Sequence, residues 1–112
     1  MTTFLPLDST GRAIPALRLK SGGAHAVSVG ASTARNSTGF DSETRIVSLY
    51  ATVPVYIKTG DSSITATTSD HFFPAGVYYD LAIGGGPVKQ ATNIAVLKAG
   101  AENGTLYISE KE

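Results

Sequence analysis

A strict alternation of apolar and polar side chains from residue 45 to residue 58 constrains the fold more than any other feature of this chain. One parity is aliphatic throughout and consists of Val47, Leu49, Ala51, Val53, Val55 and Ile57. Successive side chains point to opposite faces of a strand, so the pattern predicts one buried and one solvent-facing surface. Fourteen residues are long for one strand, and Pro54 cannot donate to a strand ladder. We therefore expect two strands that meet at a corner over residues 52–54.

The same two-residue period recurs, between turn signals, through the rest of the chain. Residues 70–73 lead into a tight reversal at Pro74-Ala75-Gly76, and strands are predicted over residues 77–83, 93–98 and 105–110. Residues 99–104 end in Asn-Gly, which predicts a hairpin between the last two strands. In the first forty residues we expect strands over 13–20 and 25–29 and a polar loop over 31–39. Whether residues 1–40 include an extended arm is left open.

These short strands predict the fold class. We expect a single all-β domain over residues 1–112. Its architecture is predicted to be an antiparallel β-sandwich or a jelly-roll-like barrel of about 7–9 short strands.

Composition argues against several functional classes. The chain has no cysteine, which excludes disulfides, thiolate metal sites and thiol catalysis. Nine basic and nine acidic residues cancel, which argues against a nucleic-acid binder. No apolar run approaches the roughly 20 residues of a membrane span. The N-terminal residues show no basic start followed by an apolar stretch, so we expect synthesis and folding in the cytoplasm.

Charge is unevenly distributed along the chain. Residues 1–40 carry four bases and one acid, a net charge of +3, whereas residues 41–112 carry five bases and eight acids, a net charge of −3. One interpretation is random scatter of surface charge. The other is a basic arm, with Arg12, Arg18, Lys20 and Arg35, that docks on an acidic neighbour.

The residues that carry chemistry form no catalytic, cofactor or metal motif, so we predict that the chain is not an enzyme. Asp70 and His71 are adjacent, and adjacent strand residues point to opposite faces. His25 belongs to no metal-binding spacing. The acids, Glu110 among them, are expected mainly in turns or on solvent-facing strand positions, although two of them facing each other across a cleft would suit sugar hydrolysis.

Tyrosines are the most prominent candidates for contact with a partner. Four of them lie on the parity opposite the aliphatic face of their strands: Tyr50, Tyr56, Tyr78 and Tyr107. We expect several to be exposed or half-exposed. Exposed tyrosines on a rigid sheet suit a protein interface and would equally suit stacking on a sugar, while covering of the outer sheet is the third interpretation.

The order of motifs from residue 44 to residue 110 resembles that of a known family. The segments are Arg45-Ile46-Val47 leading to Ala51-Thr52, Val55-Tyr56-Ile57 followed by Gly60, Thr67-Thr68-Ser69 running to Phe73-Pro74-Ala75-Gly76, Ile94-Ala95-Val96-Leu97, and Gly104-Thr105-Leu106-Tyr107-Ile108-Ser109-Glu110. They resemble the small β-rich virion structural proteins of tailed phages, prophages and gene-transfer particles. Pro54, the segment Gly84-Gly85-Gly86-Pro87 and residues 1–40 depart from that pattern.

The resemblance implies a non-enzymatic, head-associated virion protein of decoration or cement type, with no cofactor. Its expected partners are the major capsid protein or other virion proteins and further copies of itself, and its expected place is the virion. Head or tail placement is not decided by the sequence. The alternative is a glycan-binding β-sandwich or a receptor-binding accessory protein of the tail, and a small hydrolase is a third hypothesis.

Overall fold

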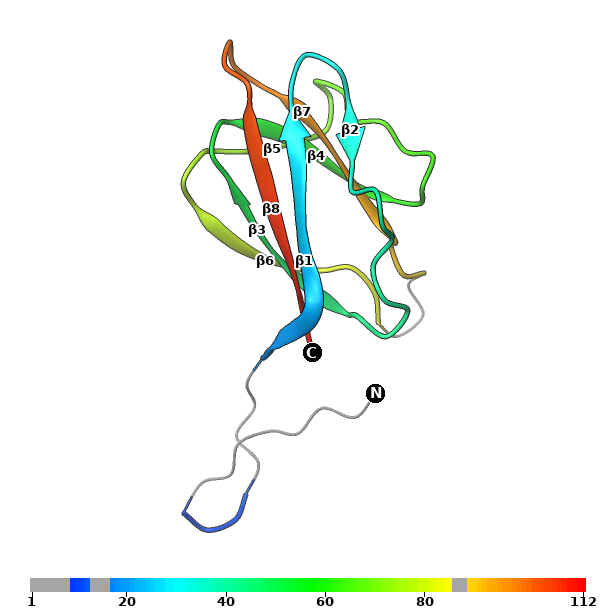
Figure 1. Cartoon of the computed structure of the whole chain (residues 1–112), viewed down its shortest axis with the longest axis vertical. Helices are drawn as coiled ribbons and strands as arrows, with labels where there is room; N and C mark the ends of the chain where they lie inside the picture. The colour runs from blue at the N-terminus through cyan, green and yellow to red at the C-terminus, as the bar shows by residue number, and fades with distance from the viewer. Residues whose placement is uncertain (1–8, 13–16, 86–88) are drawn as a thin grey trace.

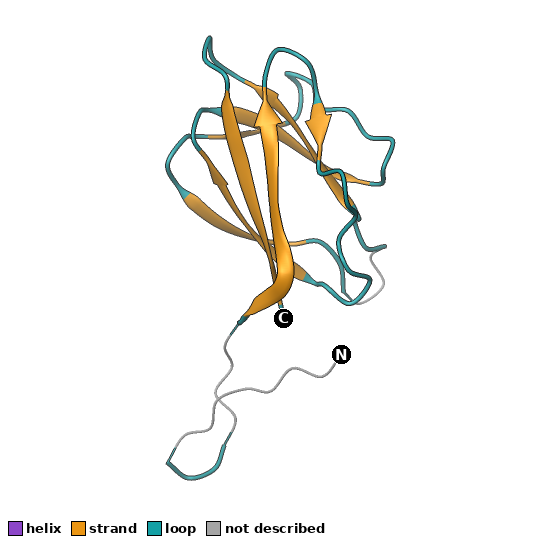
Figure 2. Cartoon of the chain, viewed as in Figure 1, coloured by secondary structure: helices purple, strands orange, loops and turns teal. Residues whose placement is uncertain are grey.

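The computed structural model describes residues 9–12, 17–85 and 89–112, and the described residues form eight strands and no helix (Figures 1 and 2). The strands are β1 (Leu19–Val29), β2 (Ala34–Arg35), β3 (Ile46–Ala51), β4 (Val55–Gly60), β5 (His71–Phe73), β6 (Tyr78–Ala82), β7 (Asn93–Lys98) and β8 (Gly104–Lys111). The predicted all-β class is confirmed.

Two four-stranded antiparallel sheets make up the body of the protein. The first has the strand order β1-β8-β3-β6 and the second β2-β7-β4-β5. Strand β3 belongs to the first sheet and β4 to the second, so residues 52–54 carry the chain from one sheet to the other, as the proline in the alternating segment predicted. Figure 1 shows β1, β8 and β3 running side by side, with β2 to the right of β1.

Both sheets contribute to one hydrophobic core. The aliphatic parity of residues 45–58 is buried as predicted, and Val47, Leu49, Val55 and Ile57 have at most 2% of their surface exposed. The same cluster holds Val27 and Val29 of β1, Ile94 and Val96 of β7, and Leu106 and Ile108 of β8. Burial of these branched side chains between the sheets is the main source of stability in a chain without disulfides.

The predicted hairpin over residues 99–104 is wrong. Strands β7 and β8, which these residues join, lie in different sheets. The turn signal is local, whereas pairing is decided by distant partners: β8 inserts between β1 and β3. At its start the Thr105 amide donates to Thr52 Oγ1 at 2.9 Å, and the Thr52 amide donates to the Thr105 carbonyl at 3.0 Å. The connection is therefore a crossing between sheets.

The first forty residues also differ from expectation. One strand, β1, replaces the two predicted over 13–20 and 25–29, although residues 13–16 lie outside the described part. Its pairing with β8 shifts register between Leu19 and Ala24, where Gly22 has a positive φ of 75°. Such a conformation suits glycine and permits a bulge inside a continuous strand. The predicted polar loop over 31–39 contains the short strand β2.

Candidate functional site

Three of the predicted contact tyrosines form a row across the outer face of the first sheet. Tyr50 on β3 lies opposite Tyr107 on β8 and opposite Tyr78 on β6. Tyr78 is 69% exposed, Tyr107 is 50% exposed and Tyr50 is half-buried, so the predicted exposure is confirmed. The ring centres of Tyr50 and Tyr78 are 5.4 Å apart, with the rings tilted by 45°. We call Tyr107, Tyr50 and Tyr78 the tyrosine row.

Tyr56 is not part of this row, because it lies on β4 in the second sheet. Its neighbours Val55 and Ile57 face the shared core, so Tyr56 points to the opposite outer face of the protein. There it is half-buried and packs against the 56% exposed Phe72 of β5, with ring centres 6.0 Å apart. The structure thus distributes the candidate tyrosines over two faces.

The four candidate bases do not meet in one patch. Lys20 pairs with Asp41 at 3.4 Å, and the Arg35 guanidinium on β2 donates to the Ile64 carbonyl at 2.8 Å. Arg18 is exposed next to the C-terminus, where its amide donates to the Glu112 carbonyl. Arg12 belongs to residues 9–12, which are exposed and lie apart from both sheets in Figure 1. Arg12, Arg18 and Arg35 are exposed, with Arg18 directly before β1 and Arg35 on β2.

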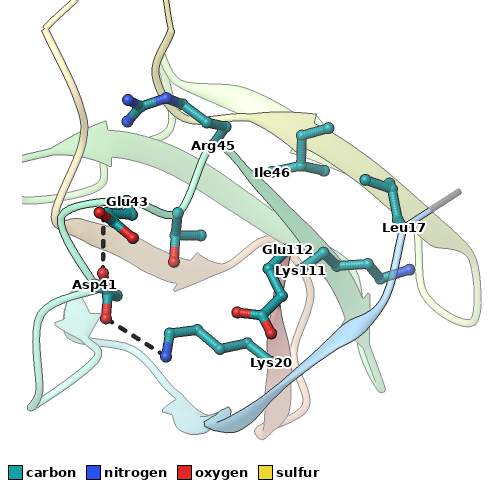
Figure 3. Close-up of a pocket in the computed structure, with 9 residues that line it drawn as sticks. Leu17, Lys20, Asp41, Glu43, Arg45, Ile46, Lys111 and Glu112 are labelled. Carbon is teal, nitrogen blue, oxygen red and sulfur yellow. Dashed lines mark hydrogen bonds and ion pairs between the residues drawn. The ribbon is translucent and has the colours of Figure 1, made fainter. Parts of the chain in front are cut away.

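A pocket of about 150 Å³ opens at the end of the first sheet where β1 begins and β8 ends (Figure 3). Its charged lining is balanced, with Lys20, Arg45 and Lys111 against Asp41, Glu43 and Glu112; Leu17, Thr44 and Ile46 complete it. Lys20 is held by Asp41, and the Lys111 ammonium lies 3.5 Å from Asp80 on the outer face of the sheet. At least three of the six charged side chains thus take part in ion pairs, and the small volume indicates a narrow gap between strands.

A buried carboxylate, Glu110, lies beneath this pocket. Only 4% of it is exposed, so the expectation of a solvated acid is wrong for this residue. Its Oε1 accepts hydrogen bonds from the Asp41 amide at 2.9 Å and from Thr44 Oγ1 at 2.6 Å, and its Oε2 lies 2.8 Å from His25 Nε2. Glu110 shares the parity of Leu106 and Ile108 on β8, which is the sequence signal that could have located it inside.

Local packing explains how the carboxylate reaches this position. At Gly23 an added Cβ would lie 2.8 Å from the Cβ of Glu110, so a side chain there would exclude it. His25 packs edge-on against Phe40, with ring centres 5.1 Å apart. Burial raises the pKa of Glu110, but the hydrogen bonds from Thr44, His25 and the Asp41 amide outweigh it, so this pKa lies below its ordinary value of 4.5.

The order of groups in this centre does not suit nucleophilic catalysis. A hydroxyl nucleophile needs an imidazole next to it as a base, with the carboxylate behind the imidazole. Here the carboxylate lies between the hydroxyl and the imidazole, and Thr44 Oγ1 donates its hydrogen bond to Glu110 rather than to His25. The arrangement instead fastens β1, the segment over residues 41–44 and β8 to one another.

The adjacent Asp70 and His71 do not form a catalytic pair either. The Asp70 carboxylate accepts hydrogen bonds from the Thr67 amide at 2.7 Å and from Thr67 Oγ1 at 3.2 Å, so it closes a turn. His71 is exposed on β5. Among the residues that the structure describes, no three histidine, aspartate or glutamate side chains gather as metal ligands, and no helix is long and apolar enough to cross a membrane.

One further polar group flanks the tyrosine row. Asp80 follows Tyr78 by two residues on the same face of β6, and 57% of its side chain is exposed. Its Oδ1 accepts a hydrogen bond from Ser48 and lies 3.5 Å from Lys111 Nζ. The hydrogen bond from Ser48 lowers the pKa of Asp80 more than burial raises it, and Lys111 lowers it further. Asp80 is therefore a carboxylate at neutral pH.

Comparisons of this chain with protein-family models, with curated proteins and with solved structures found no match.

Proposed function

We propose that this chain is a non-enzymatic structural protein of a tailed-phage or phage-like particle, of the head-associated decoration or cement type. Its partners are then the major capsid protein or other virion proteins, together with sister copies in a homo-oligomer, and its place is the virion. Repetition over a symmetric lattice would make individually weak contacts collectively strong.

One observation carries this proposal. The motif order that resembles virion proteins, residues 44–110, coincides with strands β3 to β8, which supply the centre of both sheets. The first forty residues, which have no counterpart in that pattern, supply only β1 and β2, the outermost strand of each sheet on one side. The residues that resemble virion proteins and the residues that do not thus occupy different strands, as expected for a module whose edge strands select its partner.

We also infer that the two sheets form a jelly roll. The antiparallel pairs β1–β8, β2–β7, β3–β6 and β4–β5 are all hydrogen-bonded. In this pairing the first half of the chain forms an antiparallel ribbon with the second half. When such a ribbon wraps around the core, it gives two four-stranded sheets, which is the jelly-roll topology. Jelly rolls are common in viral capsid proteins, so this topology supports a particle component.

The edge formed by β1 and β2 is the proposed contact with the particle. Arg35 lies on β2, Arg18 directly precedes β1, and Arg12 lies on the exposed residues 9–12. Residues 1–40 have a net charge of +3, from four bases and one acid. An acidic surface on the particle would complement this edge, and such contacts weaken as salt screens them.

The first experiment is mass spectrometry of density-purified particles from an induced culture of the source bacterium, with the copies of this chain counted relative to the major shell protein. Many retained copies would support the proposal, and hundreds would favour the head over the tail. A chain that is absent from the particles and stays soluble would contradict it.

The contact surface has its own test, the rebinding of purified chain to particles that lack it. The triple variant Arg12→Ala, Arg18→Ala, Arg35→Ala should bind less and lose most of the salt dependence. The matched control is Lys58→Ala, an exposed base on β4 of the second sheet. Equal binding by the triple variant and the control would exclude the β1 and β2 edge as the contact.

A further inference from the structure

The tyrosine row has the properties of a small-ligand platform. Strands β8, β3 and β6 are hydrogen-bonded neighbours (Figure 1), so the row crosses the sheet at right angles to the strands. Two strand spacings separate the exposed Tyr107 and Tyr78, a distance of about 10 Å across the sheet. Two exposed rings at that separation match alternate sugar units of an extended oligosaccharide.

The polar tips of the row are available to a ligand. The hydroxyl groups of Tyr50, Tyr78 and Tyr107 make no hydrogen bond to any other residue in the described ranges 9–12, 17–85 and 89–112. Beside them, the Asp80 side chain is 57% exposed and uses Oδ1 for Ser48 and Lys111, so Oδ2 makes neither of these contacts. Aromatic faces with a carboxylate at their side combine apolar contact with directional acceptors for hydroxyl groups.

The charge and the area of this face indicate which kind of ligand it can bind. Asp80 and Lys111 neutralise each other at 3.5 Å, so the face favours an uncharged ligand. Tyr78 and Tyr107 are 69% and 50% exposed, so together they offer roughly 200–300 Å² of contact, given about 150–250 Å² for a wholly covered aromatic side chain. A stable protein dimer needs about 800 Å² from each partner. The row is thus large enough for a short oligosaccharide and too small for a stable dimer by itself.

We propose that the tyrosine row, with Asp80 beside it, binds a neutral oligosaccharide chain. The apolar faces of its sugar rings stack on Tyr78 and Tyr107, and its hydroxyl groups bond to the tyrosine hydroxyls and to Asp80. This activity is separate from the particle contact proposed above, which uses the β1 and β2 edge, so either proposal can fail while the other holds.

The test is a titration of the full chain with three neutral hexasaccharides: β-1,4-linked glucose, β-1,4-linked N-acetylglucosamine and α-1,4-linked glucose. The chain has no tryptophan, so its intrinsic emission comes from five tyrosines, three of which are in the row. We expect at least one probe to change this emission, and to shift the amide NMR signals of β8, β3 and β6 while those of β4 and β5 stay in place.

Variants then locate the site. Tyr78→Ala and Tyr107→Ala should each weaken binding about tenfold, which is the usual size of a lost aromatic anchor. Tyr78→Phe should keep most of the binding affinity, because phenylalanine retains the aromatic face on which a sugar ring stacks. Tyr56→Ala is the matched control, since Tyr56 lies on the opposite outer face of the protein. Thermal unfolding of each variant verifies that it is folded.

Three results would overturn the proposal. One is the absence of any signal change with all three probes at millimolar concentration. Another is an equal loss of binding in Tyr56→Ala and Tyr78→Ala. The third is sedimentation showing a dimer that Tyr78→Ala dissociates, because the row would then be covered by a second copy of the chain.

Discussion

Replacing Glu110 with glutamine tests the buried centre, which consists of Glu110 and its hydrogen-bond partners His25, Thr44 and the Asp41 amide. Glutamine keeps the shape of glutamate, and its Oε1 still accepts from the Asp41 amide and Thr44 Oγ1. The contact between Glu110 Oε2 and His25 Nε2, 2.8 Å long in the wild type, loses the negative charge of the carboxylate. A hydrogen bond to a charged group contributes about 1.5–3 kcal/mol. We therefore expect Glu110→Gln to lower the free energy of unfolding by about 2 kcal/mol at pH 7.

The pH dependence provides a second readout for the same change. In the folded protein the pKa of Glu110 lies below its ordinary value of 4.5, so the unfolded chain binds the proton more readily. The stabilisation by the carboxylate is complete above pH 4.5 and is lost as the pH falls through the folded-state pKa. Other carboxyl groups titrate in both proteins, so their effects cancel in the difference. The difference in the free energy of unfolding between the wild type and Glu110→Gln should therefore become smaller towards pH 3.

The assay is urea unfolding followed by circular dichroism, at several pH values between 7 and 3. Glu102→Gln is the matched control, because Glu102 is exposed in the connection between β7 and β8. A loss in Glu110→Gln within about 0.5 kcal/mol of the control, the usual range for surface changes, would refute the reasoning. A gap between wild type and Glu110→Gln that stays constant down to pH 3 would refute the assigned pKa direction.

Three further substitutions test individual contacts of the fold. Gly23→Val places a Cβ 2.8 Å from that of Glu110, and overpacking should lower stability by about 1–3 kcal/mol in thermal unfolding. Asn36→Ala removes the side-chain oxygen that accepts from the Ile94 amide at 2.8 Å, so hydrogen exchange at Ile94 should speed up at least tenfold; unchanged protection would contradict that role. Leu49→Ala empties a fully buried position and should cost about 2–5 kcal/mol in urea unfolding.

Strand positions from residue 45 onward were predictable because they depend on local periodicity. Each inward side chain of β3 and β4 alternates with an outward one, and a strand has only two faces. The corner at residues 52–54 followed from Pro54, which has no amide hydrogen to donate. The exposure of Tyr50, Tyr78 and Tyr107 followed from the same parity. These conclusions need no knowledge of which strands pair.

Pairing itself could not be predicted from local sequence. Residues 99–104 carry a turn signal that serves a hairpin and a crossing between sheets equally well, and the choice is made by the insertion of β8 between β1 and β3. In the same way, Gly22 and Gly23 resemble a strand break, yet they form a bulge within β1. The row of three tyrosines is also a product of pairing, because its members come from separate segments of the chain.

The burial of Glu110 could not be predicted from the sequence with the rules that apply to most acidic residues. Charged side chains are rarely buried, so composition favours a solvent-facing position, and its parity with Leu106 and Ile108 was the contrary signal. A buried carboxylate is tolerated only with partners, and its partners His25, Asp41 and Thr44 come from other segments. No spacing rule in the sequence links these positions.

The buried centre also bears on how β1 keeps its register. Beyond its bulge, β1 offers the core few large side chains, and polar or small residues such as Ala24, Ala26 and Ser28 occupy its outer face. A slip of one residue would turn Val27 and Val29 outward and would also separate His25 from Glu110, leaving a buried carboxylate short of a partner. We infer that this imidazole–carboxylate contact specifies register at the edge strand. It thereby fixes the surface that we propose to face the particle.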